Sequence, residues 1–296
     1  MKLYITVNPH GGKKKGKYIL STILPLLKAA DIELNIIETA YSGHACDLAT
    51  QLDFVGYDGM VAIGGDGTLH EITNGLMRRS DNIRPPIGII PAGSGNSFMH
   101  DLKMTDIIKA TKSIISGKTK KIDVAEVKVN HVKKYAINII GWGLVTQIGK
   151  NAEYIRWLGP SRYTVMSIIE CFRYKPKAAT LVLENNKIID DFTFIIACNT
   201  IHTGKGMKMA PKAKLNDGLI DLVVVRGGIS TKKLLLTLPK VFHGTHIQDP
   251  LVEYYQVKEF GLYPKNNEVL NIDGELIGST PIHVKMIPSV IDFFSE

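Results

Sequence analysis

Cysteine is scarce in this sequence. The three cysteines, Cys46, Cys171 and Cys198, lie far apart, match no metal-ligand spacing and are odd in number. The nine histidines are also scattered, and the closest pair, His243 and His246, lacks the cysteine or carboxylate partners of a zinc site. These absences argue against a disulfide framework and a Cys/His metal site, and we expect reduced thiols in a cytosolic protein.

Long apolar runs are absent as well. The run at the amino terminus, Lys2–Val7, is too short for a signal peptide or a membrane span and is typical of a first strand. No later run approaches the roughly eighteen residues that a transmembrane helix needs. The sequence also has no low-complexity segment and no internal repeat. We therefore expect a cytoplasmic, globular protein that is peripheral to a membrane and not integral to it.

Positive charge is in excess in this sequence, with a formal net charge of +8. Such a charge suits a partner that carries phosphates, which includes a nucleotide, an anionic membrane surface and a nucleic acid. The basic clusters are short, and no basic stripe alternates with aromatic residues. Because the sequence also has no helix-turn-helix or RRM-like signature, we expect no nucleic-acid partner.

Apolar runs alternate with amphipathic stretches up to about residue 120. This alternation predicts a parallel sheet with helices on its faces and a site at the carboxyl ends of the strands. The expected strands are Lys2–Val7, Glu33–Thr39, Met60–Gly64 and Ile87–Pro91. The expected helices are Lys17–Ala30, Ala45–Phe54, Leu69–Arg79, Ser97–Leu102 and Ile107–Ser116.

After Gly117 the segments become short, β-rich and bounded by turns, which predicts a mainly antiparallel second domain. Two helices, over Ala152–Phe172 and Thr231–Val241, interrupt it. We expect domain boundaries of 1–120, with 288–296 as a candidate return, and 121–287. The expected strands are Ile122–Val129, Tyr135–Ile140, Ala179–Leu183, Phe192–Cys198, Leu219–Val225, Glu253–Phe260, Val269–Ile272 and Ile282–Met286.

Three glycine-bearing loops could bind phosphate. Gly11–Tyr18 nearly fits the P-loop pattern, but Tyr18 stands where the magnesium-binding Ser or Thr belongs, so we reject a Walker A loop and keep backbone contact to phosphate or a solvated turn as alternatives. The loop Gly64-Gly65-Asp66-Gly67-Thr68 follows a buried strand and opens a helix, where backbone amides and the helix N-terminus favour anions. Phosphate repels Asp66 unless the carboxylate handles a proton or meets a cation, which indicates general-base or magnesium-linked chemistry.

The loop Pro91–Ser97 repeats this pattern at the end of the next strand. Two such loops on neighbouring strands would form one phosphate-binding crevice. Asp273-Gly274 between two apolar runs is the strongest short signal for a β-hairpin, so the sequence alone assigns it to a turn.

Taken together, these motifs resemble the diacylglycerol kinase catalytic domain superfamily, which includes bacterial lipid kinases, sphingosine kinases and ceramide kinases. The resemblance spans nearly the whole chain and rests on six motifs in order. These are Asn8–Gly12, Thr39–Ala45, Gly64–Glu71, Pro91–Asn96, Leu215–Leu219 and Asp273–Glu275.

The resemblance implies an α/β protein with two domains. The first is a three-layer α/β nucleotide-binding domain, and the second is a mainly antiparallel β-sandwich that binds lipid, with an ATP cleft between them. It implies ATP and Mg²⁺ as cofactors, a lipid substrate at a membrane surface and, as an open question, a homodimer. The implied nucleotide contacts are Asn8, Pro9, His10, Thr39, Ala40, Tyr41, Ser42, Gly43, Gly64, Gly65, Asp66, Gly67, Thr68, Glu71, Gly93, Ser94, Gly95, Asp273, Gly274 and Glu275.

The sphingosine kinase branch is the most similar, because the spacing from Gly141-Trp142-Gly143 to Tyr163 matches it. By this likeness Arg156 and Arg162 reach ATP phosphates, a task that suits the permanent charge of arginine. Two departures matter: Gln147 and Gly149 stand where that branch has an acidic residue for an amino-alcohol head, and Ser97 follows Asn96 where bacterial diacylglycerol kinases have Asp. The lipid therefore stays open between diacylglycerol and sphingosine or ceramide types.

Two further roles follow only from the resemblance. Asp66 and Glu275 are both candidates for the base that accepts the lipid hydroxyl proton, with Asp66 placed first. The segment Lys214–Leu219 resembles a structural magnesium loop, in which Asp217 supplies a carboxylate and Lys214 and Leu219 supply carbonyls; an ordinary Asn-Asp-Gly turn is the alternative.

Two rival functions remain. A soluble-substrate kinase such as NAD kinase shares a Gly-Gly-Asp-Gly loop, and a regulator could keep the fold and bind nucleotide or lipid without turnover. The later Asp273–Glu275 motif and the Trp142–Tyr163 segment favour a lipid kinase over both. Apolar residues over Tyr154–Phe172 fit a lipid gate or a core equally well.

Overall fold

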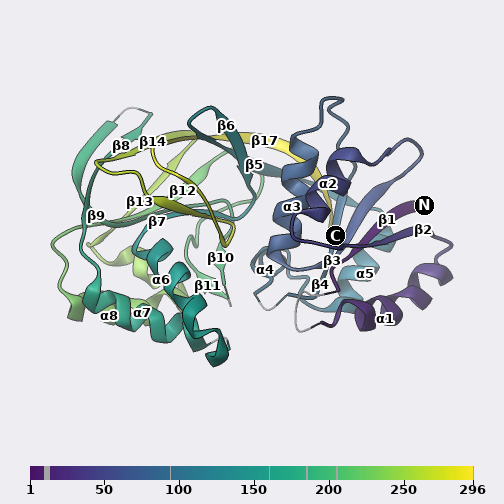
Figure 1. The fold of residues 1–296 in the computed structure, drawn as a ribbon, viewed down its shortest axis with the longest axis horizontal. Coiled ribbons are helices and arrows are strands. Elements are labelled where there is room, and N and C mark those ends of the chain that lie inside the picture. Colours follow the sequence, from purple (N-terminus) through teal and green to yellow (C-terminus); the bar gives the residue numbers. More distant parts are fainter. Residues whose placement is uncertain (10–13, 94, 160, 185, 205, 296) are drawn as a thin grey trace. The chain divides into compact units, whose positions relative to one another are not determined.

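The chain forms two compact units, drawn together in Figure 1. Unit 1 is Met1–Val124 with Pro288–Glu296, and unit 2 is Ala125–Ile287. The computed structural model describes residues 1–9, 14–93, 95–159, 161–184, 186–204 and 206–295, and it does not describe the side chain of Arg156. Among the helices within these ranges, none is long and apolar enough to span a bilayer.

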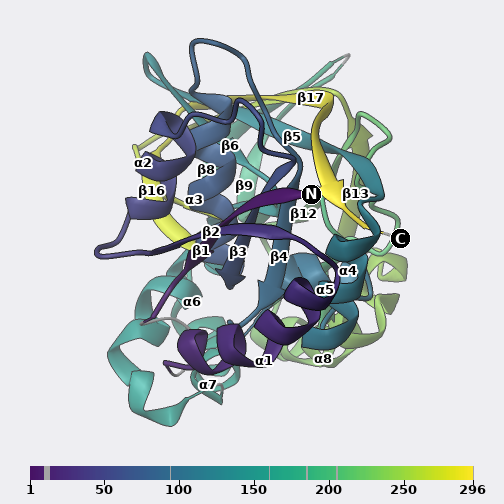
Figure 2. The same cartoon turned by 90° about the vertical axis from the view of Figure 1, so that its right-hand side faces the viewer.

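Unit 1 is built on a parallel sheet in the order β4-β3-β1-β2. Every residue of β3 and β4 is buried, as expected for strands that helices cover on both faces. Figure 2 shows α2 and α3 on one side of the sheet and α1 and α5 on the other. The strands are β1 (Lys2–Val7), β2 (Glu33–Glu38), β3 (Gly59–Gly64) and β4 (Ile87–Pro91), and the helices are α1 (Gly16–Ala29), α2 (His44–Gln51), α3 (Asp66–Met77), α4 (Ser97–Asp101) and α5 (Ile107–Ser116).

The last residues of the chain belong to unit 1. Strand β17 (Ile282–Phe294) ends with Phe293 paired in parallel with Ile87 of β4. The ring of Phe293 packs on that of Phe98, with 4.9 Å between centroids. Asp292 forms an ion pair of 3.0 Å with Lys121. These contacts extend the parallel sheet by a strand that lies far away in the sequence.

Unit 2 is an antiparallel β structure. Its long path of paired strands runs β16-β15-β7-β9-β8-β14-β17. Strand β12 also pairs with β9 and β13 pairs with β12, while β5 pairs with β17 and β6 pairs with β5. Trp142 and Phe192 are among its fully buried core side chains. The strands are β5 (Thr119–Val129), β6 (Val132–Ala136), β7 (Ile139–Gly143), β8 (Lys177–Leu183), β9 (Asn186–Cys198), β10 (His202–Thr203), β11 (Met207–Lys208), β12 (Ile220–Arg226), β13 (Val252–Val257), β14 (Glu259–Pro264), β15 (Val269–Ile272) and β16 (Glu275–Ser279).

Helices interrupt unit 2 at two places. The expected single helix over Ala152–Phe172 is wrong in its extent: the structure has α6 (Leu144–Ala152), the 3₁₀ helix η1 (Glu153–Leu158) and α7 (Ser161–Arg173). Gly159, between η1 and α7, has a φ of +57°, so the chain leaves the right-handed helical region there. The second interruption is α8 (Thr231–His243), followed by the 3₁₀ helix η2 (Thr245–Gln248).

Candidate functional site

The turn from β3 into α3 brings the first glycine loop against the sheet edge. Gly64 is the last residue of β3, Gly65 is in an extended conformation, and Asp66 begins α3. A Cβ on Gly64 would lie 2.5 Å from Oγ1 of Thr68, so only glycine allows this approach. The helix therefore begins with its amide end and the positive end of its dipole at the edge of the sheet.

The second glycine loop follows β4 and folds back on itself through Asn96. The side-chain oxygen of Asn96 accepts from the backbone N–H of Gly93 at 3.1 Å, and the side-chain N–H donates to the carbonyl of Gly93 at 3.0 Å. Asn96 has a φ of +51°, a conformation that asparagine tolerates better than most residues. Ser94 lies outside the described residues, so its expected phosphate contact stays a prediction.

The two glycine loops touch. A Cβ on Gly65 would lie 2.9 Å from Cα of Gly93, and a Cβ on Gly93 would lie 2.7 Å from Cα of Gly65. The backbone N–H of Ala92 also donates to the carbonyl of Gly64 at 2.7 Å. We call Gly64–Thr68 and Ala92–Asn96 the paired glycine loops. Their backbones approach as closely as they do because neither contact residue has a side chain.

Asp66 joins the paired glycine loops to α4. Its carboxylate accepts from the backbone N–H of Ser97 at 2.9 Å and from that of Phe98 at 3.3 Å. The carboxylate thus links the first residue of α3 to the first two residues of α4. Asp66 therefore has a positioning role in this structure, and no local pattern of residues indicates that role.

Asn8 lies at the end of β1 beside the first turn of α3. Its backbone N–H donates to the carbonyl of Ile63 at 3.1 Å, and its side-chain N–H donates to Oγ1 of Thr68 at 3.5 Å. A Cβ on Gly16, the first residue of α1, would lie 2.6 Å from the carbonyl oxygen of Asn8. The structure thus places Asn8 next to the first glycine loop. Pro9 follows it directly, whereas His10 lies outside the described residues.

Glu71 fixes the loop that follows β2. Its carboxylate accepts from the backbone N–H of Gly43 at 2.9 Å and from that of Ala45 at 3.1 Å. Gly43 has a φ of +93°, which favours glycine at that position. Glu71 was expected to contact nucleotide. The structure shows it bonded to the amide end of α2, where a negative charge complements the helix dipole.

The loop Thr39–Gly43 has its own internal contacts. The backbone N–H of Thr39 donates to the carbonyl of Val7 at 2.9 Å, and that of Ala40 donates to Nδ1 of His44 at 2.9 Å. Tyr41 stacks on His44 and donates to Asp47 at 2.8 Å, and its ring is 58% exposed. The hydrogen bond to Asp47 raises the pKa of Tyr41, so its phenol stays protonated at neutral pH. Ser42 is exposed beside it.

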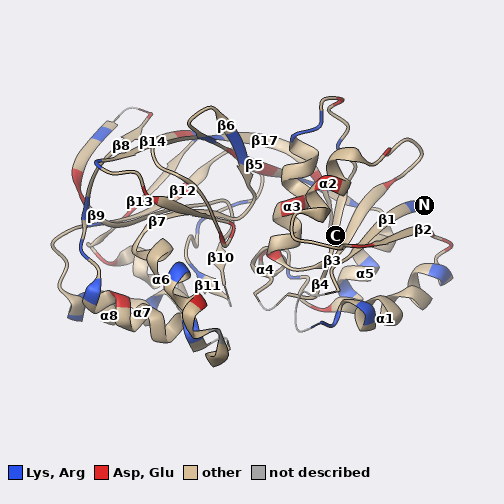
Figure 3. Cartoon of the chain, viewed as in Figure 1, with Lys and Arg blue, Asp and Glu red and all other residues tan. Residues whose placement is uncertain are grey.

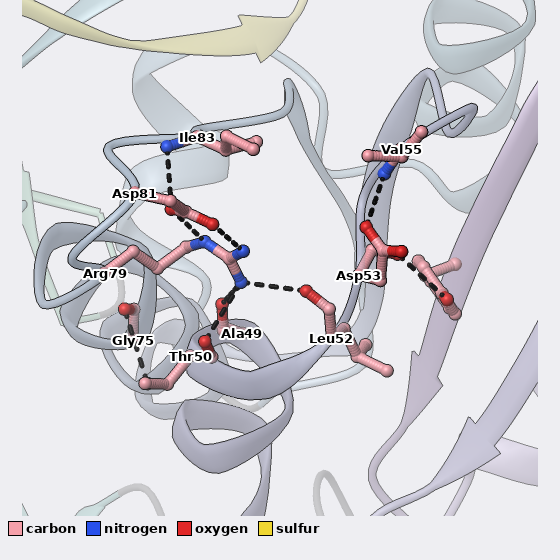
Figure 4. Close-up of polar contacts among 10 residues, drawn as sticks. Ala49, Thr50, Leu52, Asp53, Val55, Gly75, Arg79, Asp81 and Ile83 are labelled. Atoms are coloured by element: carbon pink, nitrogen blue, oxygen red, sulfur yellow. Dashed lines mark hydrogen bonds and ion pairs between the residues drawn. The ribbon is translucent and has the colours of Figure 1, made fainter.

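Arg79 holds the opposite end of α2, as Figure 4 shows. One terminal nitrogen of its guanidinium donates to the carbonyls of Ala49, Thr50 and Leu52 at 2.9–3.2 Å, and the rest of the group forms an ion pair with Asp81. A negative charge at the N-terminus of α2 and a positive charge at its C-terminus both interact favourably with the helix dipole. Glu71 in the middle of α3 and Arg79 just after its end thus fix α2 and the preceding loop.

The two arginines that are expected to contact ATP lie in unit 2, and the structure describes the side chain of only one of them. Arg162 forms an ion pair of 3.1 Å with Glu153 and lies over the ring of Tyr163. Arg156 lies in η1, and its side chain is outside what the structure describes. Of the apolar residues in this segment, Tyr154 and Trp157 are 77% and 81% exposed, whereas Met166 is buried. The segment therefore contains both exposed and core residues, and the phosphate contacts of the two arginines stay predictions.

The Asp273-Gly274 pair forms the hairpin turn between β15 and β16. Both residues have positive φ, +54° and +97°, as a two-residue type I′ turn requires. The Asp273 side chain is buried, and its carboxylate accepts three hydrogen bonds, from the backbone N–H groups of Ile137, Asn138 and Ile139, at 2.8–3.0 Å. Asp273 therefore anchors the start of β7, while Glu275 is exposed at the start of β16.

The segment Lys214–Leu219 contains a short turn, in which Asp217 accepts from the backbone N–H of Leu219 at 3.1 Å. Lys214 and Asp217 are exposed. No group of three or more His, Cys, Asp or Glu side chains within the described ranges could hold a metal ion. A magnesium ion here would depend on one carboxylate, carbonyls and water, so this expectation stays a prediction.

Sequence reasoning missed Asp221 on β12. Its side chain is fully buried, and Oδ1 accepts from the hydroxyl of Tyr254 at 2.6 Å and from Nε2 of Gln256 at 3.0 Å. Within the part of the chain that the structure describes, Oδ2 has no hydrogen-bond partner. Burial raises the pKa of Asp221 to about 6. The available signal was the acid inside the apolar run Ile220–Val225.

Comparisons with known proteins agree with this architecture. Residues 2–127 match the model of the diacylglycerol kinase catalytic domain, and residues 138–295 match that of the YegS C-terminal NAD kinase beta sandwich-like domain. A crystal structure of a diacylglycerol kinase from Bacillus anthracis superposes with a TM-score of 0.77 at 23% identity, covering 100% of this chain and 97% of that one, which shows the fold.

Two curated relatives align over most of their length. Sphingosine kinase 1 of Arabidopsis thaliana is 32% identical over 332 aligned residues, which cover 93% of this chain and 68% of that protein. Diacylglycerol kinase of Bacillus subtilis is 28% identical, with 94% of this chain and 90% of that protein covered. The α/β nucleotide-binding unit, the antiparallel β-sandwich and these alignments together show that the chain belongs to the diacylglycerol kinase family, in which it is similar to both bacterial diacylglycerol kinases and plant sphingosine kinases.

Proposed function

We propose that this protein is an ATP-dependent lipid kinase. The observation that carries the proposal is the contact between the paired glycine loops at the carboxyl ends of β3 and β4, with Asp66 bonded across to α4. Two helices begin at these loops, and helix amide ends bind phosphate groups well. Membership of the diacylglycerol kinase family supports ATP as the phosphoryl donor and a lipid alcohol as the acceptor.

The reaction is an in-line transfer of the γ-phosphoryl group. The lipid hydroxyl oxygen forms a bond to the γ-phosphorus, the bond from that phosphorus to the β–γ bridging oxygen breaks, ADP leaves, and the hydroxyl proton passes to a carboxylate. Most of the acceleration in such reactions comes from positioning and charge stabilisation. The amides of the paired glycine loops and the side chains of Asn8 and Thr68 lie together at one edge of the sheet to supply that positioning.

The carboxylate that takes the proton is proposed to be Asp66, with Glu275 as the alternative. Asp66 lies within the paired glycine loops, so phosphate bound there would bring the reacting hydroxyl close to it. Glu275 is exposed on the β15–β16 hairpin of unit 2, and among the described residues no side-chain hydrogen bond or ion pair fixes its carboxylate. A base of this kind contributes roughly 10²–10⁴-fold to the rate.

The donor atoms available to Mg²⁺ are the hard oxygens that this ion prefers. They are the carboxylate of Asp66 in unit 1 and that of Asp217 in unit 2. Within the described ranges, neither belongs to a group of three or more His, Cys, Asp or Glu side chains that could hold a metal ion. Magnesium usually keeps several waters and binds one or two carboxylates together with substrate phosphates, so one acid at each site fits the ion. When bound with ATP, the ion would neutralise charge on the β- and γ-phosphates.

The lipid acceptor is proposed to have a neutral head. Gln147 is half-buried on α6, and a Cβ on Gly149 would meet Nδ2 of Asn271 at 3.2 Å, so neutral amides stand where an amino-alcohol would need a carboxylate. We propose that the protein acts from the cytoplasm at a membrane surface, where diacylglycerol-like or ceramide-like alcohols lie. A homodimer is an additional proposal, which the molar mass in solution tests.

The deciding experiment is a radiolabelled ATP assay with a substrate panel. The panel contains diacylglycerol, monoacylglycerol, ceramide, sphingosine and NAD, each with Mg²⁺. Phosphate in a lipid product supports the proposal, phosphate on NAD favours a soluble-substrate kinase, and no transfer to any of them favours a non-catalytic regulator.

The Asp66→Asn variant tests the proposed base. It should lower kcat by at least roughly 100-fold while ATP still binds, because the amide keeps an acceptor for α4 but cannot take a proton. Asp31→Asn, at an exposed turn with a φ of +53°, is the matched control and should keep wild-type activity. Near-normal turnover by Asp66→Asn would remove Asp66 as the base, and the same loss in Glu275→Gln alone would assign that role to Glu275.

A further inference from the structure

Helix α8 lies on the surface of unit 2 with one side half-buried, through Leu234, Leu235 and Leu238, and the other side exposed. It has one buried residue, Val241, although five of its residues are Leu or Phe. Leu236 is 63% exposed and Phe242 is 50% exposed. Exposed apolar side chains gathered on one element mark an interaction surface more often than singly scattered ones do.

The exposed side of α8 combines apolar and basic groups. At helical spacing, Lys232, Leu236 and Pro239 share one stripe, with Lys233 and Phe242 at its two margins. We call these five residues the α8 surface. The helix that carries them has a firm beginning and end, since Ser230 accepts from the backbone N–H of Lys233 and Gly244 ends it with a φ of +73°.

Helix α7 packs against α8 and extends the apolar area. Phe172, in the last turn of α7, is 68% exposed. Arg173 and Lys175 follow it and are also exposed, without an ion-pair partner in the described part of the chain. The same combination of an exposed apolar side chain and adjacent cations therefore occurs on both helices.

The charge of this helical layer is one-sided. Residues 144–175 and α8 together contain eight Lys or Arg and two Asp or Glu, a difference of +6 out of the chain's +8. Both acids are engaged, because Glu153 pairs with Arg162 and the buried Glu170 accepts from Asn151. Lys240 pairs with Asp249 at 3.0 Å, whereas Lys232 and Lys233 have no carboxylate at ion-pair distance among the described residues. Figure 3 marks the Lys and Arg positions along the chain in blue and the Asp and Glu positions in red.

We propose that the α8 surface docks the protein on an anionic lipid bilayer. An amphipathic helix of this kind lies in the interface, with apolar side chains at the acyl boundary and Lys stems that extend their ammonium groups toward lipid phosphates. The inference rests on the proposed function, because a kinase that acts on a membrane lipid must bind where that lipid lies. The additional elements are the α8 surface as the contact and an anionic lipid headgroup as its partner.

The charge pattern disfavours other occupants. A second copy bound through a two-fold axis would bring the basic α8 surface against the same surface of its partner, where like charges repel. A nucleic acid would leave Leu236 and Phe242 at the centre of the contact without the base stacking that rewards aromatic residues in such sites.

Vesicle co-sedimentation tests the proposal with phosphatidylcholine vesicles, with and without phosphatidylglycerol. Lys232→Gln/Lys233→Gln should weaken binding to the anionic vesicles on the order of 30-fold, since each cation near such a surface contributes about 1 kcal/mol. That variant should also lose most of the salt dependence. Leu236→Ser/Phe242→Ser should weaken binding to both vesicle types by roughly tenfold or more, because it removes apolar area.

A matched control is available on the β8–β9 hairpin, where Lys187 and Ile189 are exposed and Ile189 is 72% accessible. Lys187→Gln/Ile189→Ser removes one cation and one apolar side chain from unit 2 outside α8, and it should bind vesicles like the wild type. Circular dichroism and thermal melting establish that all variants fold. Wild-type vesicle binding by both α8 variants would overturn the proposal.

Two further measurements distinguish membrane docking through α8 from a dimer interface and from the proposed kinase function. If the wild type is a dimer by light scattering, and Leu236→Ser/Phe242→Ser makes it a monomer without changing vesicle binding, the α8 surface binds a second copy and the proposal is wrong. Kinase assays in detergent micelles should give the same kcat for the wild type and the α8 variants. Vesicle binding that depends on α8 in a protein that phosphorylates no lipid would refute the proposed function and leave the docking surface intact.

Discussion

Asp221 provides a quantitative test of the unit 2 structure. Its carboxyl group is fully buried, and burial raises its pKa from the ordinary value of 3.8 to about 6, against the hydrogen bonds from Tyr254 and Gln256, which lower it. Between these two pH values the folded protein keeps a proton on Asp221 that the unfolded chain has released. The free energy of unfolding must therefore depend on pH through this residue.

The sign and size follow from the pKa shift. Because the native state binds more protons than the unfolded state, the free energy of unfolding falls as the pH rises from about 4 to about 6, and above that the contribution of Asp221 stays constant. One pKa unit corresponds to about 1.4 kcal/mol, so the whole decrease is about 3 kcal/mol. Asn at position 221 cannot titrate. The free energy of unfolding of Asp221→Asn, measured relative to that of the wild type, should therefore rise by about 3 kcal/mol between about pH 4 and pH 7. Any further effect of burying the amide is the same at every pH and does not change this difference.

The assay is urea unfolding at several pH values, followed by tryptophan fluorescence in EDTA. Both tryptophans, Trp142 and Trp157, lie in unit 2, so the signal reports on that unit. Tyr254→Phe is the second variant, and it removes a hydrogen bond that lowers the pKa of Asp221. The free energy of unfolding of this variant should therefore continue to fall up to a higher pH than that of the wild type. Parallel stability curves for the wild type and Asp221→Asn from pH 4 to 7 would refute the reasoning.

Two other substitutions test the positions of backbone groups. Gly93→Ala puts a methyl group 2.7 Å from Cα of Gly65 and should lower kcat/KM for ATP by roughly 10- to 100-fold with the fold retained, because small misplacements of positioning groups are costly. An unchanged kcat/KM for ATP in Gly93→Ala would argue against contact between the loops. Asp273→Asn should lower the urea stability of unit 2 by about 1–3 kcal/mol, since the amide cannot accept all three N–H groups. Wild-type stability of that variant would mean that the anchor contributes little.

The strands and helices of unit 1 follow closely from the sequence. The expected strands Lys2–Val7 and Ile87–Pro91 and the expected helix Ile107–Ser116 have the same bounds in the structure. Apolar periodicity is a strong local signal where strands are buried on both faces and helices on one. The expected fold class and the resemblance to the diacylglycerol kinase family are confirmed by the structure and the comparisons.

Helix boundaries in unit 2 were harder to predict. The sequence predicted one helix over Ala152–Phe172, whereas the structure divides this region and begins α6 at Leu144. The break depends on the positive φ of Gly159, and a glycine inside a helical pattern does not by itself show which conformation it adopts. Phe172 and Trp157 also have the same apolar character as Met166, and only packing leaves the first two exposed.

The sequence by itself determined the chemistry present at each strand end: glycines where backbones approach, an acid in an anion-binding loop, and a hairpin at Asp273-Gly274. Tertiary structure alone decided what the acids contact, because hydrogen bonds between distant backbone groups leave no pattern in the chain. Glu71 bonds to the start of α2, Asp66 to that of α4, and Asp273 to that of β7. Local residue types fix conformation over a few residues, whereas partners far away in the chain depend on how the elements pack.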